Sequence, residues 1–289
     1  MTAGHTRLLL LDLGNTRLKA CFVRIGPDEA REDVARDTTW EWEETKSVST
    51  GPSLATELES WLASQGECVA ATDAAALTFV ASHEREQEVR EVLRKHIDGP
   101  LFAPPDCGML RDVRHPETIG LDRLFAARGA ATRQCSESSV SRWIVVDAGT
   151  AVTVDAVLVE DDESAPLRFL GGAIAPGPEL LARALADGGA RLPLVDIAPG
   201  ARALGKETTE ALQAGVVVGF EGAVQRLVHS IASELSWEQP EVILTGGAAP
   251  FLHELADRED WVRDERLVLR GLAHATLEAL RMSRAERGS

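Results

Sequence analysis

The sequence predicts an α/β protein made of two similar halves, and three observations lead to this fold class. Apolar runs typical of strands alternate with stretches of helical periodicity along the whole chain. A strand, an Asp-x-Gly turn and a second strand occur at Asp12 and again at Asp147. The length of 289 residues is also typical of two domains. We therefore expect halves at residues 1–137 and 138–289.

The first half opens with a predicted β-hairpin. The apolar run RLLLLDL at 7–13 is typical of a buried strand, and RLKACFVRI at 17–25 predicts its partner. Gly14 and Asn15 lie between the two runs, and these residue types favour a tight turn. The same reasoning predicts the remaining elements in order: a strand over 41–50, a helix over 52–65, a strand over 77–81, a helix over 84–97, a loop over 98–118 and a helix over 120–133.

The second half repeats this opening after a polar linker predicted at 134–141. Strands are expected at 143–147 and 152–159, joined by a turn at Ala148 and Gly149. The elements predicted after this hairpin are a strand over 169–174, helices over 178–186 and 208–235, a strand over 242–244 that ends in Thr245-Gly246-Gly247, and a last helix that follows 267–269 and runs through Arg281.

Composition and charge exclude several classes of protein. The formal net charge is −16, with a pI near 4.9, and no basic cluster interrupts the acidic surface, so a nucleic-acid partner is not expected. No apolar run reaches the roughly 18 residues of a membrane helix, and the first residues lack the pattern of a signal peptide. The four cysteines lie far apart without metal-ligand spacing. We expect a cytoplasmic protein with no membrane partner and no zinc site.

The two Asp-x-Gly turns suit the binding of phosphates. A glycine lets backbone N–H groups approach a phosphate closely, and nearby hydroxyl and amide side chains add hydrogen bonds. The carboxylates of Asp12 and Asp147 can hold cations that offset the phosphate charge. Either turn alone is also an ordinary hairpin turn. Two copies, together with the glycine turn at 245–247, favour a nucleotide site, and the arrangement resembles the paired hairpins of the actin, hexokinase and Hsp70 superfamily.

Two other motifs resemble functional sites but also have purely structural interpretations. Residues 200–207, GARALGKE, match the phosphate-binding pattern G-x-x-x-x-G-K, but Glu207 stands where a serine or threonine should bind Mg²⁺. A turn that leads into the helix at Thr208 is therefore the favoured interpretation. The segment GLDR at 120–123 places an acidic residue in the first turn of a helix, which the helix dipole favours without any site.

The order of the motifs resembles that of the type III pantothenate kinases. The matching segments are DLGNT (12–16), ETIGLDR (117–123), DAGTAVT (147–153), GGAIAPG (171–177), LGKETTEALQAG (204–215) and TGGAA (245–249). The resemblance implies two ribonuclease-H-like, actin-like ATPase halves with a nucleotide cleft between them. It also implies a homodimer that transfers phosphate from ATP to pantothenate, in the first step of coenzyme A biosynthesis, and that requires Mg²⁺ and a monovalent cation, K⁺ or NH₄⁺.

The resemblance also assigns roles to individual residues. Asp122 would be the general base, Asp147 would hold the monovalent cation, and Asp12 would hold Mg²⁺, directly or through water. The ATP-binding residues would be Asp12, Gly14, Asn15, Thr16, Lys19 and Thr150. The pantothenate-binding residues would be Gly120, Leu121, Asp122, Arg123 and Thr208. Thr208 would act from across the dimer interface, and the apolar stripe of its helix (Leu212, Val216, Val217, Phe220, Val224) is expected to serve that interface.

One departure from the family pattern concerns the substrate pocket. Val113 occupies a position where the family usually has tyrosine, and the chain contains no tyrosine. Two alternatives stay open beside a pantothenate kinase: a non-catalytic, transcription-accessory relative of the same family, and another small-molecule kinase of the superfamily. The carboxylates Asp12, Asp122 and Asp147 favour a catalyst over the accessory protein.

Overall fold

The computed structural model describes residues 5–26, 40–133, 140–160 and 167–288, which form two compact units. Unit 1 takes the described residues of Met1–Met109, Glu117–Ser136 and Leu267–Ser289. Unit 2 takes those of Leu110–Pro116 and Glu137–Arg266. Most of the predicted linker, 134–139, lies outside the described residues.

The sheet of unit 1 confirms the predicted hairpin. Its strand order is β3-β2-β1-β5-β6, and β4 also pairs with β2. The strands are β1 (Thr6–Leu13), β2 (Arg17–Ile25), β3 (Glu41–Trp42), β4 (Lys46–Ser49), β5 (Ala74–Phe79) and β6 (Leu101–Phe102). The strand expected over 41–50 is divided into two short strands, and the expected loop over 98–118 contains β6, β7 and a short 3₁₀ helix, η1 (Pro116–Thr118).

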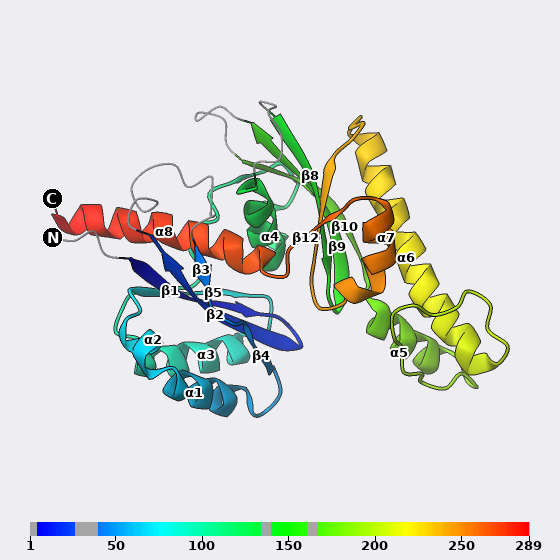
Figure 1. Cartoon of the computed structure of the whole chain (residues 1–289), viewed down its shortest axis with the longest axis horizontal. Helices are drawn as coiled ribbons and strands as arrows, with labels where there is room; N and C mark the ends of the chain where they lie inside the picture. The colour runs from blue at the N-terminus through cyan, green and yellow to red at the C-terminus, as the bar shows by residue number, and fades with distance from the viewer. Residues whose placement is uncertain (1–4, 27–39, 134–139, 161–166, 289) are drawn as a thin grey trace. The chain divides into compact units, whose positions relative to one another are not determined.

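Helices cover both faces of this sheet, as Figure 1 shows. The helices of unit 1 are α1 (Leu54–Ser64), α2 (Gly66–Ala70), α3 (His83–His96), α4 (Leu121–Ala131) and α8 (Leu267–Gly288). Leu9, Leu11 and Phe22 point from β1 and β2 into a buried core with residues of α1 and α3. Alternate residues point to the other face, where α8 packs against β1 and β5. Both faces of β1 are therefore buried, which explains its continuous run of leucines.

The last helix differs from the predicted division at 137/138, which placed it in the second half. The structure assigns α8 to unit 1, because it packs along α4 and against the sheet. The two helices approach closely at Gly129 and Gly271, where a Cβ atom would lie 2.1 Å from the Leu267 carbonyl oxygen or 1.9 Å from that of Phe125. Only glycine allows this crossing.

Unit 2 repeats the strand order of unit 1. Its sheet has the order β12-β11-β8-β9-β10-β7. The strands are β7 (Leu110–Arg111), β8 (Val140–Ala148), β9 (Ala151–Glu160), β10 (Arg168–Pro176), β11 (Glu241–Thr245) and β12 (Val262–Arg263). In both units the first hairpin strand, β1 or β8, lies between its antiparallel hairpin partner and a later parallel strand. The prediction of two similar α/β halves is thereby confirmed.

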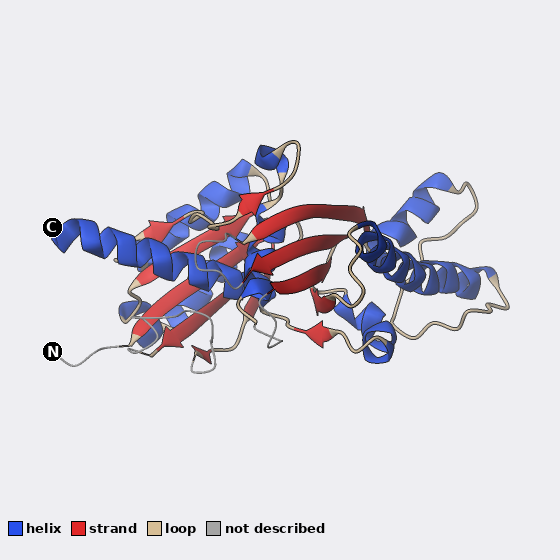
Figure 2. Ribbon diagram, turned by 90° about the horizontal axis from the view of Figure 1, so that it is seen from above, coloured by secondary structure: helices blue, strands red, loops and turns tan. Residues whose placement is uncertain are grey.

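One long helix dominates the helical layer of unit 2. Its helices are α5 (Pro178–Gly188), α6 (Thr208–Glu234), the 3₁₀ helix η2 (Ala249–Leu252) and α7 (His253–Arg258). The middle of α6 packs Phe220, Val224 and Val228 onto Ile144 and Val146 of β8. Its first turns extend past the strands beside α5 (Figure 2). No helix in the described part of the chain is long and apolar enough to cross a membrane.

Candidate active site

Asp12 lies at the carboxyl end of β1, next to a tight turn that a backbone hydrogen bond closes. Its neighbours in the sheet are Lys19 on β2 and Thr78 on β5. The Gly14 N–H donates to the Arg17 carbonyl oxygen at 2.9 Å and closes the turn. Asn15 is exposed, as is Thr16. This turn therefore presents a carboxylate, a lysine and short polar side chains at one end of the sheet.

Asp122 occupies the first turn of α4, where local contacts fix its carboxylate. The backbone N–H of Arg123 donates to Asp122 Oδ1 at 2.8 Å. A Cβ atom at Gly120 would lie 2.5 Å from the same oxygen, so a side chain at this position would displace the Asp122 carboxylate. Burial raises the pKa of the Asp122 carboxyl, while the Arg123 N–H and the Arg123 charge act in the opposite direction.

The two carboxylates of unit 1 lie at the same end of its sheet. The Val80 N–H donates to the Leu13 carbonyl oxygen at 3.0 Å, which holds the chain after β5 beside the end of β1. The start of α4 reaches this point, because a Cβ atom at Gly120 would lie 3.6 Å from Val80 Cγ1. The fold therefore brings the segments of Asp12 and Asp122 together from positions far apart in the sequence.

Asp147 lies at the end of β8 in unit 2, with threonines on both neighbouring strands. Its register partners are Thr153 on β9 and Thr245 on β11. The glycine turn after β11 closes over it, because Gly246 has a φ of +95° and its Cβ would lie 2.5 Å from Asp147 Oδ1. The Ala248 N–H also donates to the Ala148 carbonyl oxygen at 2.7 Å. Two glycine turns distant in the sequence thus meet at one carboxylate.

Thr150 is exposed at the tip of this hairpin. Its carbonyl oxygen accepts from the Gly177 N–H at 2.9 Å, so the end of GGAIAPG lies against the turn as well. Backbone N–H groups and hydroxyls are donors suited to phosphate oxygens. The arrangement can serve as a nucleotide-binding turn.

The start of α6 differs from a phosphate-binding loop. Residues 189–207, all of which the structure describes, contain neither strand nor helix, so no strand leads into 200–207. The backbone N–H of Lys206 already donates to Glu210 Oε2 at 2.6 Å. Thr208 is exposed as the first residue of α6. This geometry supports the interpretation of a turn that leads into a helix, and leaves Thr208 accessible.

The donor set suits a magnesium ion that the nucleotide carries. No group of three or more His, Cys, Asp or Glu side chains in the described part of the chain could hold a metal ion. Mg²⁺ in kinases is bound by one or two carboxylates together with substrate phosphates and water. The Asp12 carboxylate of unit 1 fits this pattern, with Lys19 beside it as a partner for phosphate. In unit 2, Asp147 and its two neighbouring threonines form a separate set of oxygen ligands.

The sequence analysis missed two threonines at these sites. Thr78 Oγ1 and Thr153 Oγ1 are buried, and neither has a hydrogen-bond partner among the described residues. Each stands in register with one of the aspartates. In the sequence, each appears only as a hydroxyl residue in a strand. That it lies beside an aspartate can be recognised only when the pairing of the strands is known.

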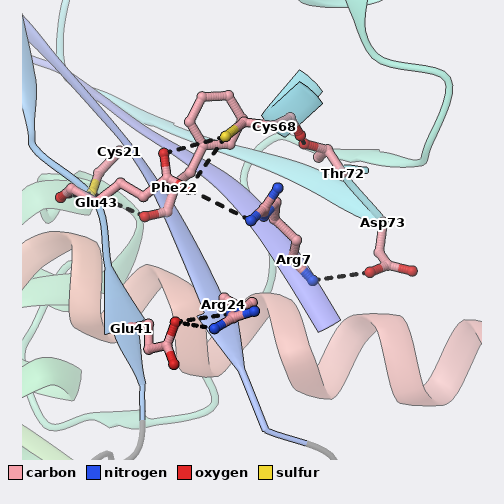
Figure 3. A network of polar contacts seen from close by, with 9 residues as sticks. All are labelled: Arg7, Cys21, Phe22, Arg24, Glu41, Glu43, Cys68, Thr72 and Asp73. Atoms are coloured by element: carbon pink, nitrogen blue, oxygen red, sulfur yellow. Dashed lines mark hydrogen bonds and ion pairs between the residues drawn. The ribbon is translucent and has the colours of Figure 1, made fainter. Parts of the chain in front are cut away.

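The cysteines take part in structural contacts at the other end of the first sheet. Figure 3 shows Cys68 beside Glu43, whose carboxylate accepts from the thiol at 3.3 Å. Burial and this carboxylate raise the pKa of the Cys68 thiol. Cys21 donates to the Glu43 carbonyl oxygen at 3.1 Å and is buried. A raised thiol pKa disfavours the thiolate, so Cys68 does not have the character of a nucleophile.

Comparisons with known proteins match most of the chain. The family model described as type III pantothenate kinase matches residues 8–230. A type III pantothenate kinase of Thermus thermophilus is 40% identical over 195 residues, which are 67% of this chain and 73% of the relative. One of Hyphomonas neptunium is 33% identical over 236 residues, covering 78% of this chain and 87% of the relative. The match includes both aspartate turns and the start of α4, and on these grounds the chain belongs to the type III pantothenate kinase family.

Proposed function

We propose that this chain phosphorylates pantothenate with ATP, the first step of coenzyme A biosynthesis. The observation that carries this proposal is the Asp122 carboxylate, which is partly buried at the end of the sheet that also holds Asp12. Membership of the family supplies the substrate. The chain is therefore an ATP-dependent kinase with an alcohol acceptor.

Asp122 acts as the general base in this proposal. Its carboxylate accepts the proton of the pantothenate hydroxyl while the hydroxyl oxygen bonds to the γ-phosphorus of ATP. The bond from that phosphorus to the bridging oxygen breaks, and ADP leaves. The raised pKa favours proton transfer, because burial makes the carboxylate more basic than an exposed aspartate. Gly120, Leu121 and Arg123 bind pantothenate, whose carboxylate the Arg123 guanidinium can pair with.

The glycine turns hold ATP in this proposal. Backbone N–H groups of the turn at Gly14, with Asn15, Thr16 and Lys19, bind its phosphates, and Thr150 binds the nucleotide from the second turn. When bound at Asp12, Mg²⁺ neutralises phosphate charge. When bound at Asp147, K⁺ or NH₄⁺ adds a further positive charge, which matters in a chain of net charge −16. The nucleotide cleft expected between the two halves remains a prediction.

The active form in this proposal is a homodimer. Eight large hydrophobic side chains are exposed in the described part of the chain, and six of them lie on β10, α5, α6 and the connection between these helices: Ile174, Leu180, Leu185, Leu194, Leu204 and Val218. These side chains lie on consecutive parts of unit 2, and exposed apolar side chains favour an interface. The exposed Thr208 lies in the same region and can reach the pantothenate site of a partner.

The proposed setting is the cytoplasm. Each described cysteine is a free thiol, which suits a reducing compartment.

Phosphorylation of pantothenate by the purified protein tests this function. We expect transfer of the γ-phosphate from radiolabelled ATP to pantothenate, with a much higher rate in K⁺ or NH₄⁺ buffer than in Na⁺ buffer. A panel of other alcohol acceptors separates this kinase from other members of the superfamily. A protein that binds ATP but turns over no acceptor would instead match the accessory relative.

A further inference from the structure

Thr78 is a fully buried threonine whose hydroxyl has no hydrogen-bond partner among the described residues. Leaving a buried hydroxyl unpaired is unfavourable, and buried polar groups in folded proteins are almost always paired. A valine would fill the same space without this cost. Packing of the core therefore does not explain why a threonine occupies this position.

The position of Thr78 beside Asp12 offers an explanation. Thr78 is the register partner of Asp12 across the parallel strands β5 and β1, so the two side chains leave the sheet on the same face. The neighbouring residues Leu11, Leu13 and Leu77 point to the opposite face, into the core with α1 and α3. Two residues beyond Thr78, Val80 lies 3.6 Å from the position of a Cβ atom at Gly120, next to Asp122. The unpaired hydroxyl thus lies beside the proposed Mg²⁺ carboxylate and on the side of the proposed base.

Unit 2 also places threonines beside its aspartate, although on different strands. By strand order the counterpart of Thr78 is Thr245 on β11, which is buried and in register with Asp147, whereas Thr153 lies on the hairpin partner β9. Thr153 is the register partner of Asp147, and its hydroxyl is also buried without a partner among the described residues. In each unit a threonine therefore flanks the aspartate that ends the first hairpin strand.

We propose that Thr78 is a positioning residue for the cation held at Asp12. In the cation-loaded protein its hydroxyl donates a hydrogen bond to one carboxylate oxygen of Asp12 and leaves the other oxygen directed at the cation or its bound water. Carboxylates that hold metals are themselves commonly oriented by such hydrogen bonds, and the loss of one lowers metal affinity by roughly 10- to 100-fold. The inference rests on the proposed function, because it takes Asp12 as the carboxylate that holds Mg²⁺.

Substitution of Thr78 by valine and by serine tests this role. Valine keeps the shape and removes the hydroxyl, whereas serine keeps the hydroxyl. The control is Thr6→Val, because Thr6 is a buried threonine at the opposite end of β1. The probe is Mn²⁺ in place of Mg²⁺, titrated into protein in molar excess over a non-hydrolysable ATP analogue, so that little free nucleotide competes for the ion. Loss of the signal of free Mn²⁺ in electron paramagnetic resonance measures the bound ion without turnover.

We expect Thr78→Val to weaken Mn²⁺ binding by at least roughly tenfold. Thr78→Ser should bind within about twofold of the wild type, and Thr6→Val should bind like the wild type. Thr78→Val should also unfold at a temperature equal to or above that of the wild type, because the unpaired hydroxyl is gone. Loss of Mn²⁺ affinity in a variant that is at least as stable is an outcome that a purely structural role would not produce.

Unchanged Mn²⁺ affinity in Thr78→Val would overturn the proposal, as would a wild type that binds no Mn²⁺ beside the nucleotide. Failure of the proposed function is visible separately. If the wild type binds Mn²⁺ and the nucleotide but does not phosphorylate pantothenate, the acceptor is wrong, while the comparison between valine and serine still tests the role of Thr78.

Discussion

Asp122 combines a raised pKa with a fixed orientation, and its substitution tests the proposed base. Asp122→Asn keeps the shape of the side chain but cannot accept the proton of the acceptor hydroxyl. We expect kcat to fall by roughly 10²- to 10⁴-fold while ATP binding persists. Steady-state kinetics and nucleotide binding measure the two effects. Activity within a few-fold of the wild type would remove Asp122 from this role.

The same pKa shift makes a second prediction, for stability and pH. Burial raises the folded-state pKa of Asp122 above its unfolded value, so protonation favours the folded state at low pH, and this contribution is lost as the pH rises through the folded pKa. Charging this carboxyl is therefore less favourable in the native state than in the unfolded chain. Asp122→Asn should raise the melting temperature at pH 7, and calorimetry checks this. A lower melting temperature would mean that the carboxylate stabilises the fold.

Asp147 can be tested through the monovalent cation. If its carboxylate holds K⁺, the wild-type rate should rise from Na⁺ to K⁺ or NH₄⁺ buffer, and Asp147→Asn should remove this rise and leave the rate near the level in Na⁺. Initial rates in the three buffers at equal ionic strength provide the measurement. Equal rates of the wild type in Na⁺ and K⁺ would exclude the cation from the mechanism.

Substitution of Val113 tests how its side chain affects the affinity for pantothenate. Its side chain is half-buried after β7, and Val113 Cγ1 lies 3.5 Å from the position of a Cβ atom at Gly171. A hydrogen bond contributes about 0.5–1.5 kcal/mol, so Val113→Tyr should lower KM for pantothenate by up to roughly tenfold without a change in kcat. Val113→Phe adds the ring without the hydroxyl and serves as the control. A KM that rises in the tyrosine variant would contradict the prediction.

At the scale of elements, the packing of α4 and α8 encloses a histidine among positive charges. His274 of α8 is almost fully buried and lies against Trp40, with the ring centroids 4.4 Å apart. Burial, and then the charges of Arg128, Arg270 and Arg281, lower its pKa to about 3. The nearby carboxylate of Glu278 pairs with Arg128. The folded state therefore disfavours protonation of His274 at a pH at which the unfolded chain would bind the proton.

The lowered pKa of His274 predicts that the folded protein loses stability in acid. Because the pKa of His274 falls on folding, its contribution to stability is present above about pH 6.5 and is lost as the pH falls toward 3, by about 1.4 kcal/mol per pH unit. His274→Phe keeps the ring and removes the proton site, so it should lose less stability than the wild type between pH 6.5 and pH 5. Urea unfolding across this range checks the slope. His83→Phe, at an exposed histidine of α3, is the control.

The proposed dimer needs an interface other than the one expected. The stripe Leu212, Val216, Val217, Phe220 and Val224 is buried within the single chain, so it forms core and not an interface. The exposed apolar side chains of β10, α5 and α6 remain available. Leu180, which is 41% exposed on α5, is a suitable position for a test.

Leu180→Glu should shift the protein from dimer to monomer, because a charge on both copies opposes a shared apolar interface. We expect activity to fall with the loss of the dimer, since Thr208 would no longer reach the partner's pocket. Light scattering and kinetics measure the two effects. Met282→Glu is the matched control, because Met282 is 67% exposed on α8 in unit 1. A fully active monomer would refute the shared site.

The local elements could be predicted from the sequence, and so could the turns on which the proposed site is built. The leucine run of β1, the Gly14 turn and the start of α6 at Thr208 follow from periodicity and turn chemistry, which act between near neighbours. The two Asp-x-Gly turns revealed the repeated halves, because a repeated motif is visible without any contact. Short strands such as β6 and β12 escaped prediction, because two residues carry no periodic signal.

Contacts between residues distant in the sequence depend on how the elements pack. The return of α8 to unit 1 depends on the close crossing at Gly129 and Gly271, and glycines inside helical patterns do not identify their partner. The burial of the α6 stripe in its own core could not be distinguished from an interface, because both need the same apolar face. Thr78 gained its place beside Asp12 from the register of two strands more than 60 residues apart in the chain. Register and helix crossing are set by packing between segments, and a linear sequence does not display it.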